Sequence, residues 1–253
     1  MIEQNPYDLL KEDMIEKKIE WLDFLESWFG KSEYIAELGF PHRKKTKNLE
    51  HTFRQLLFFG AEMRNDVYST VYVFRKMKYV EHAANPQRKH IPDYSSAFIN
   101  KAYWELDFTH KKQGCMQDAY DDCMKLMDYF NNECRVYYTT GKGFHIYVDL
   151  LLSITKIELR EYTRFIIDGL KLETADCGFI GDISRIMRVP YFIHSKTKQF
   201  ILPVTRNMSL QYMIENSKTC FTPIKVTRKP LNLSERWGSV NDNGGNTASL
   251  SKT

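Results

Sequence analysis

The chain has 253 residues, with 36 Lys and Arg against 32 Asp and Glu, so its formal charge is only +4. Hydrophobic residues make up 43% of the sequence, which is enough for a core and excludes wholesale disorder. Mean hydropathy is −0.48 and the apolar runs are too short to cross a bilayer, which excludes a membrane-spanning protein. The N-terminus shows no basic and apolar signal segment, and the five cysteines are an odd number and widely spread. We therefore expect a cytoplasmic, intracellular protein with reduced thiols.

The first part of the chain is expected to be helical. Apolar residues recur at helical spacing over residues 7–38, with Glu and Lys between them. A basic stretch at 42–47 follows, which we interpret as a solvated loop, with a phosphate-contacting loop as the functional alternative. Residues 1–65 are therefore expected to form a helical N-terminal segment.

From residue 67 the pattern changes to that of a mixed domain. β-Branched and aromatic residues predict strands after 67, a polar loop covers 82–94, and residues 237–253 are rich in Gly, Ser and Asn. We expect an α+β catalytic domain over 66–236 and a flexible tail or linker over 237–253. The other expected elements are a strand at 102–108, a helix at 116–131, strands at 135–140 and 144–151, a helix at 157–172, and an extended segment at 185–204.

Two acids flank a leucine in the segment Glu105-Leu106-Asp107. Alternate side chains of a strand share a face, so both carboxylates point one way, whereas Trp104 and Leu106 point the other way into a core. Adjacent carboxylates repel each other, and a divalent cation that prefers oxygen ligands removes this repulsion. The segment predicts a metal-binding pair, or, as the plain alternative, a solvent-facing edge strand.

The turn Gly141-Lys142-Gly143 joins two expected strands and leads to His145. Glycines let a backbone approach a phosphate closely, and Lys142 adds a positive charge. His145 is expected on the face of its strand opposite to the apolar residues that flank it. The turn predicts a phosphate-binding loop, or a hairpin turn with an incidental histidine.

A basic stretch follows Asp176, because the sequence from Ile183 to Ile214 contains no acid. Guanidinium and ammonium groups beside aromatic rings suit a triphosphate, backbone phosphates and a stacked base. A solvated charged face is the plain alternative. The bases are Arg185, Arg188, His194, Lys196, Lys198 and Arg206, and the rings between them include Tyr191 and Phe192.

In this order the three segments resemble the archaeo-eukaryotic primase superfamily, most closely the small primase–polymerase domains of archaeal plasmids and viruses. The resemblance covers about residues 66–206, and the first acid departs from it, because the family more often has Asp there. The motifs are the acid pair Glu105-Leu106-Asp107, the turn from Thr140 to His145, and Asp176 followed by Arg185, Arg188, Pro190, His194 and Lys196.

The resemblance implies a catalytic core with an RRM-like antiparallel sheet. It also implies a DNA primase or polymerase that makes or extends primers on single-stranded DNA in replication, by template-directed nucleotidyl transfer with two metal ions. Glu105, Asp107 and Asp176 are the expected catalytic metal ligands, with Asp182 as the alternative third acid. The residues expected to bind the nucleotide are Lys142, His145, Arg185, Arg188, His194 and Lys196.

The same resemblance implies Mg²⁺ or Mn²⁺ as cofactor and single-stranded DNA with NTP or dNTP as partners. It leaves open an attached helicase or large primase subunit, and no membrane partner is expected. Many relatives carry zinc, which we do not expect here, because His110, Cys115, Cys123 and Cys134 include no C-x-x-C pair. Buried free thiols are expected instead. The alternative function is a catalytically silent primase-like subunit that binds single-stranded nucleic acid.

Overall fold

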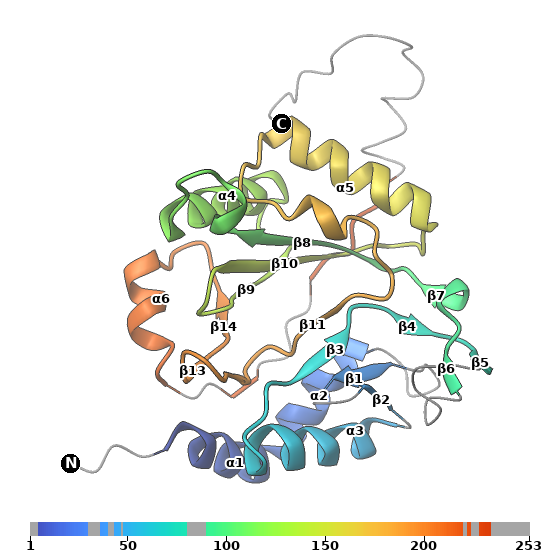
Figure 1. The fold of residues 1–253 in the computed structure, drawn as a ribbon, viewed down its shortest axis with the longest axis vertical. Helices are drawn as coiled ribbons and strands as arrows, with labels where there is room; N and C mark the ends of the chain where they lie inside the picture. Colours follow the sequence, from blue (N-terminus) through green and yellow to red (C-terminus); the bar gives the residue numbers. More distant parts are fainter. Residues whose placement is uncertain are drawn as a thin grey trace.

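The computed structural model describes residues 5–29, 36–39, 43–46, 48–79, 90–219, 222–223 and 228–233. Within these ranges two four-stranded antiparallel sheets lie between two groups of helices (Figure 1). Sheet I consists, in spatial order, of β14 (Leu202–Val204), β9 (Arg135–Tyr138), β10 (Gly143–Asp149) and β8 (Lys101–Asp107). Sheet II consists of β11 (Ile186–Arg188), β3 (Tyr68–Thr70), β1 (Glu37–Gly39) and β2 (Arg43–Lys45).

Two helices, α4 (Met116–Tyr129) and α5 (Lys156–Leu170), cover one face of sheet I (Figure 1). The alternation along β8 puts Trp104 and Leu106 on this face, where both are almost fully buried. Phe144 and Ile146 of β10 are fully buried beside them. The opposite face of sheet I, which carries Glu105 and Asp107, is therefore turned away from α4 and α5.

The N-terminal helices lie on the far side of sheet II (Figure 1). They are α1 (Pro6–Glu16), α2 (Lys18–Phe29) and α3 (Leu49–Leu56), and α3 continues as a π-helical turn over Leu57–Glu62. Asn5 and Asn48 cap α1 and α3 by accepting hydrogen bonds from backbone N–H groups of the first turn. The helical pattern predicted over 7–38 is therefore confirmed for α1 and α2.

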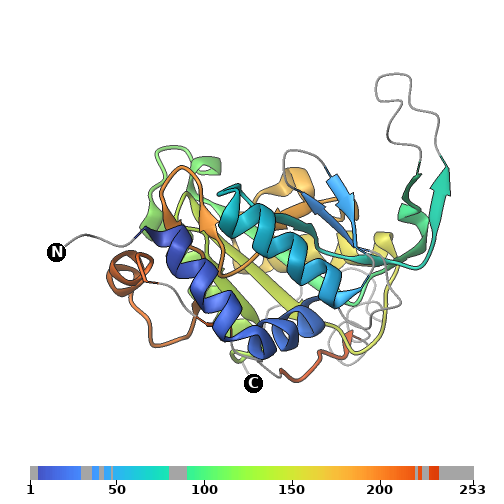
Figure 2. The same cartoon turned by 90° about the horizontal axis from the view of Figure 1, so that it is seen from below.

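Short elements complete the described fold. The ribbon of β5 and β6 projects from the body of the protein (Figure 2). In the described part of the chain no helix is both long and apolar enough to cross a membrane. The elements are β4 (Val73–Phe74) with β7 (Ala97–Phe98), β5 (Met77–Tyr79) with β6 (His90–Pro92), β12 (Ile193–His194) with β13 (Gln199–Phe200), α6 (Leu210–Asn216), and 3-10 turns at Tyr94–Ser96, Phe108–His110 and Cys177–Phe179.

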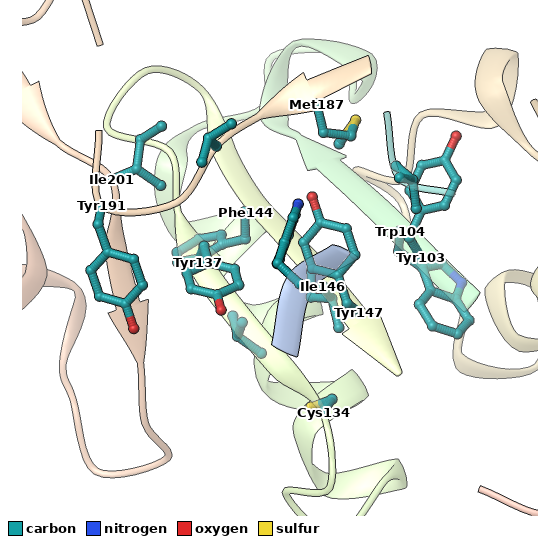
Figure 3. Packing of buried hydrophobic residues seen from close by; sticks show 14 of the residues in the cluster. Tyr103, Trp104, Cys134, Tyr137, Phe144, Ile146, Tyr147, Met187, Tyr191 and Ile201 are labelled. Carbon is teal, nitrogen blue, oxygen red and sulfur yellow. The ribbon is translucent and has the colours of Figure 1, made fainter. Parts of the chain in front are cut away.

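One hydrophobic core joins the N-terminal helices to both sheets. The ring of Trp28 in α2 packs edge-on against Tyr147 and Tyr137 of sheet I, with centroids 4.9 and 6.0 Å apart. Tyr191 lies in this same core and is 2% exposed (Figure 3). Phe192 belongs to the same core and is 1% exposed. The expectation that these two rings stack on a base in a groove is therefore wrong, because the N-terminal helices cover them.

Two local predictions are corrected by pairings between distant residues. Residues 37–39 form β1 rather than the end of a helix, because they pair with β3, about thirty residues later. Residues 43–45 form β2 rather than a loop, because they pair with β1. Propensity is a weak guide where a partner strand is available. The loop residues 80–89 and the tail 237–253 lie outside the described residues.

Two buried cations hold the C-terminal end of α2 on sheet I. Lys101 Nζ donates to the carbonyl of Trp28 at 2.5 Å, and Arg135 Nη1 donates to the carbonyl of Ser27 at 3.4 Å. The last carbonyls of a helix have no intrahelical partner and carry partial negative charge, so cations are favourable there. Arg135 also pairs with Asp149. Lys101 has no such direct acid, and burial, aided by the charge of Arg135, lowers its pKa to about 7.

Stability is therefore expected to depend on pH through Lys101. Above about pH 7 the folded protein holds this amine neutral, whereas the unfolded chain still binds the proton up to about pH 10. The unfolded state binds more protons in this window, so the free energy of unfolding rises with pH, by about 2 kcal/mol between about pH 7 and pH 9. Urea unfolding of the wild type and Lys101→Met at both pH values measures it. Parallel pH profiles for the two proteins would show that Lys101 titrates normally.

Candidate active site

The site is built on one row of residues across sheet I. Glu105 on β8 pairs in register with His145 on β10, and Asp107 pairs with Gly143. Directly opposite residues of an antiparallel pair share a face. His145 Nε2 accordingly lies 3.9 Å from Glu105 Oε1, on the face away from α4 and α5. The expectation that His145 faces away from its apolar neighbours is confirmed, although His145 is only 7% exposed.

Asp176 extends this row on the other side of β8. The N–H of Asp176 donates to the carbonyl of Glu105 at 2.9 Å, and the N–H of Asp107 donates to Thr174 at 2.8 Å. These two bonds flank an isolated antiparallel bridge between Leu106 and Ala175. Asp176 is therefore directly opposite Glu105, and the row runs His145, Glu105, Asp176.

Asp182, the alternative third acid, lies in the loop before β11. Its Oδ1 accepts hydrogen bonds from the N–H and hydroxyl of Ser184, at 2.9 and 2.7 Å. Burial raises the pKa of the nearby Tyr103, and the charges of Asp182, Glu105 and Asp176 raise it further. Asp176 and Asp182 both affect the Tyr103 hydroxyl. Only the backbone of Asp176 is hydrogen-bonded to β8, the strand that carries Glu105 and Asp107.

Asp107, next to the row, and Asp176, in the row, are each held by a defined set of donors. Asp107 Oδ1 accepts from the N–H and hydroxyl of Thr109 at 2.8 and 2.6 Å, and Lys142 Nζ lies 3.3 Å from Oδ2. Burial acts to raise the pKa of Asp107, but these donors outweigh it and hold the pKa below its ordinary value. Asp176 accepts from the N–H of Gly178 at 2.9 Å and lies 3.2 Å from His110 Nε2.

Arg185 brings a guanidinium from sheet II to the row. Its Nη2 donates to Glu105 Oε2 at 2.7 Å, and its Cζ lies 3.4 Å from the centre of the Phe179 ring. Its Nε is buried and has no hydrogen-bond partner among the described residues. Leaving a buried donor unpaired costs about 1–3 kcal/mol. Such a donor beside a carboxylate row is available to an anionic ligand.

Burial, more than the charges around it, keeps the ring of His145 neutral. Burial lowers the pKa of His145 to about 4, and the positive charges of Arg188 and Arg185 add to this effect against the opposing charge of Glu105. At neutral pH the imidazole therefore acts as a hydrogen-bonding group and carries no charge. Burial lowers the pKa of His194 as well, and the positive charge of Arg188 lowers it further.

The Gly-Lys-Gly turn and the β12–β13 hairpin lie against each other. A Cβ atom on Gly141 would lie 3.1 Å from His194 Nε2, and the Thr140 and Thr197 hydroxyls are 2.9 Å apart. The N–H of Lys196 donates to His194 Nδ1 at 3.2 Å. The structure therefore brings the predicted turn and the predicted His-x-Lys segment into one basic rim beside the acid row.

The structure assigns the glycines of the turn a different role from the one expected. A Cβ on Gly143 would lie 1.8 Å from the carbonyl oxygen of Leu106, so the pairing of β10 with β8 requires glycine. The residue of the turn with left-handed backbone is Thr140, with φ of 60°. Close approach to a phosphate remains a prediction for Gly141.

The basic stretch does not form a single surface. Arg206 donates two hydrogen bonds to Asp128 of α4, at 2.8 and 3.0 Å, and Lys198 Nζ lies 5.5 Å from the centre of the Tyr7 ring in α1. These two bases therefore point away from the acid row. Lys142 is an open cation of the rim, with a side chain 63% exposed.

The oxygen donors of the row suit Mg²⁺ or Mn²⁺. Three carboxylates from β8 and its neighbouring segment share one face, and hard divalent cations prefer such ligands. No three His, Cys, Asp or Glu side chains of the described chain are close enough together to hold an ion. Glu105, Asp107 and Asp176 are instead each bound to other donors. The fit of a divalent cation therefore rests on the kind of ligand atoms present, which are carboxylate oxygens.

Two of the cysteines are buried thiols, as expected. Cys123 and Cys134 are buried, whereas Cys115 and Cys177 are exposed. Burial raises the pKa of Cys134 to about 11 and that of Cys123 further above its ordinary value. The absence of zinc stays a prediction. Cys220 lies outside the described residues.

Several residues of the site were missed by the sequence reasoning. Asp66 and Tyr68 contact Arg188, His110 contacts Asp176, and Phe179 lies under Arg185. None stands in a motif. Thr109 alone had a readable signal, since a Thr two residues after an Asp is a usual partner of its carboxylate.

No protein-family model matches the chain, and no curated protein matches it in sequence. Its structural neighbours are primase and primase–polymerase domains. The archaeo-eukaryotic primase domain of the cyanophage S-2L primase–polymerase has a TM-score of 0.47 and 14% identity, and the match covers 79% of this chain and 98% of that chain. Primase RepB′ has a TM-score of 0.44 and 11% identity, covering 76% of this chain and 57% of that chain. The catalytic domain of primase RepB′ in complex with initiator DNA has a TM-score of 0.43 and 13% identity, covering 76% of this chain and 86% of that chain.

Proposed function

We propose that the chain is a DNA primase or primase–polymerase that transfers nucleotides to a growing strand on a single-stranded DNA template. The observation that carries this proposal is the row His145, Glu105, Asp176 on one face of sheet I, with Arg185 beside it. Phosphoryl transfer asks for positioning and for charge stabilisation rather than for covalent chemistry by the protein. Carboxylates faced by guanidinium groups meet that demand.

The cations of the site would bind the triphosphate of the incoming nucleotide. Arg185 offers its buried, unpaired Nε, and Lys142 and Lys196 extend from the rim. His145 is neutral and would donate or accept a hydrogen bond at a phosphate oxygen. Negative charge developing on the phosphate oxygens is thus met by fixed guanidinium groups, which need little reorganisation during the reaction.

Glu105, Asp107 and Asp176 would hold the divalent ions. When bound, Mg²⁺ or Mn²⁺ supplies stabilisation of charge on the attacking and leaving oxygens. Asp107 keeps the ionised form that this requires to a lower pH than usual, because Thr109 and Lys142 lower its pKa against the effect of burial.

The test is a primer-extension and priming assay with the full chain. A single-stranded DNA template is incubated with Mg²⁺ or Mn²⁺ and with NTP or dNTP, with and without an annealed primer. Products that grow with template length are expected in at least one nucleotide set. Absence of any product in every arm would contradict the proposal, and comparison of the arms separates priming from extension and shows the sugar preference.

A second function is favoured by one observation, the ion pair between Arg185 and Glu105 at 2.7 Å. A guanidinium that neutralises Glu105 removes the need for a metal ion there. The chain would then be a catalytically silent subunit that holds single-stranded DNA. Binding of single-stranded DNA without any extension in the same assay would select this function.

A further inference from the structure

Asp66, two residues before β3 of sheet II, accepts three hydrogen bonds through one carboxylate. Oδ1 accepts from Arg188 Nη1 at 2.5 Å and from the N–H of Ser195 at 2.8 Å, and Oδ2 accepts from the Ser195 hydroxyl at 2.5 Å. Asp66 thereby joins two segments that are both basic, the end of β11 and the start of the hairpin that carries His194 and Lys196.

The strand pairing around Asp66 fixes Arg188 from a second side. Arg188 pairs in register with Tyr68 on β3, and its Cζ lies 4.9 Å from the centre of the Tyr68 ring. The N–H of Val189 donates to the carbonyl of Val67 at 3.0 Å. The guanidinium is thus held between a carboxylate and a ring, and a long flexible side chain loses most of its rotamer freedom before any ligand arrives.

Arg188 is held beside the hairpin that carries His194, because Asp66 Oδ1 accepts hydrogen bonds from both Arg188 and the N–H of Ser195. After burial, the charge of Arg188 also lowers the pKa of His194 and of His145. The Asp66 carboxylate is therefore the one group in the described chain that contacts both Arg188 and the backbone of the His-x-Lys hairpin. Removal of the Asp66 carboxylate or of its charge is expected to alter the positions of Arg188 and of the hairpin backbone.

We propose that Asp66 is a positioning residue for the triphosphate, which aims Arg188 and the 194–196 backbone at the phosphates without touching them. This inference rests on the proposed function, because it takes Arg188 to be a phosphate ligand. It adds a residue that lies in none of the motifs and stands two residues before β3, the strand that pairs with β11.

The inference predicts that Asp66→Asn changes triphosphate affinity differently in two proteins, one with Arg188 and one with Arg188→Gln. With Arg188 present, Asp66→Asn releases the guanidinium and weakens triphosphate binding, by about tenfold, since a charge-assisted hydrogen bond is lost. In an Arg188→Gln protein, the unpaired carboxylate of Asp66 faces the phosphates and repels them. There, Asp66→Asn leaves binding unchanged or strengthens it. A merely structural role for Asp66 would weaken binding in both backgrounds.

The test is calorimetric titration of the full chain with ATP, dATP and inorganic tripolyphosphate in the presence of Mg²⁺. Four proteins form the cycle: the wild type, Asp66→Asn, Arg188→Gln and the double variant. The matched control is Asp128→Asn, which also removes an acid paired with an arginine of the basic stretch, Arg206, but away from the site. It should bind all three probes as the wild type does. Tripolyphosphate has no base or sugar, so the effect of Asp66 must persist with it.

The outcomes separate this inference from the proposed function. Wild-type binding that Asp66→Asn weakens only when Arg188 is present supports the inference. Equal weakening in both backgrounds, or none in either, overturns it while the proposed function stands. A wild type that binds none of the probes overturns the proposed function and the inference with it. If Asp66→Asn does not fold, Ser195→Ala replaces it in the cycle, because it removes one of the three bonds to Asp66, and about twofold weaker binding confined to the Arg188 background is then expected.

Discussion

Asp107→Asn is expected to lower the rate of primer extension by about a thousandfold or more, with the protein still folded and still bound to single-stranded DNA. Loss of one charged metal ligand removes several kcal/mol of transition-state stabilisation, and each 1.36 kcal/mol corresponds to about tenfold in rate. The measurement is single-turnover extension of a labelled primer, with DNA affinity from fluorescence anisotropy.

The fold is expected to survive because Asn keeps the local hydrogen bonds. Asp107 caps the 3-10 turn Phe108–His110 by accepting from the N–H and hydroxyl of Thr109. An Asn side-chain oxygen accepts both of these bonds, so the free energy of unfolding should fall by less than about 1 kcal/mol. Asp107→Ala would lose the cap as well, which makes Asn the cleaner substitution.

Asp93→Asn is the matched control for this substitution. Asp93 caps the 3-10 turn Tyr94–Ser96 in the same way, accepting from the N–H of Ser95 at 3.2 Å and from its hydroxyl at 2.8 Å. It lies outside the acid row, so its variant should retain normal extension and normal stability. Normal extension by Asp107→Asn would remove the acid pair from the catalytic machinery and with it the enzyme function proposed for the chain.

Gly143→Ala is expected to have the largest effect on folding. The added methyl group would lie 1.8 Å from the carbonyl oxygen of Leu106, and it would meet backbone rather than the end of a flexible side chain. The strands β8 and β10 must then separate where Asp107 pairs with Gly143. We expect a loss of about 3 kcal/mol or more in the free energy of unfolding, at the upper end of overpacking effects.

Urea unfolding followed by circular dichroism measures this loss, and the extension assay on the folded fraction measures the displacement of Asp107. The control is Gly169→Ala, at an exposed position within α5. Alanine is the better helix former there, so this variant should gain about 0.5–1 kcal/mol. An unfolding midpoint for Gly143→Ala equal to that of the wild type would contradict the strand register on which the site is built.

Elements with strong local patterns were predicted well from the sequence. The strand of the acid pair, the two helices α4 and α5, and the hairpin around residues 141–143 are all confirmed. Each has a period of two or of 3.6, or a Gly-rich turn, within one short window. The face of His145 followed from the same alternation. Pairings between distant segments were not predictable in this way, as the corrections at β1 and β2 show.

Only the tertiary structure decided which acid each arginine of the basic stretch contacts. Arg185, Arg188 and Arg206 stand in one basic stretch, yet they bind Glu105, Asp66 and Asp128, on three different elements. Sequence distance carries no information on which acid a long flexible side chain reaches. The position of Asp176 opposite Glu105 is likewise a result of one bridge between distant residues.

The sequence by itself determined that the chain has a core, that its class is mixed α and β, and which short segments carry chemistry. The net charge of the whole chain was a poor guide to function. A value of +4 is the difference between 36 basic and 32 acidic residues and does not show where they lie. Only the tertiary structure decided that His145, Glu105 and Asp176 form one row and that Tyr191 and Phe192 are core. The physical reason is that local periodicity sets which face a side chain takes, whereas packing and strand pairing between distant segments set what that face meets.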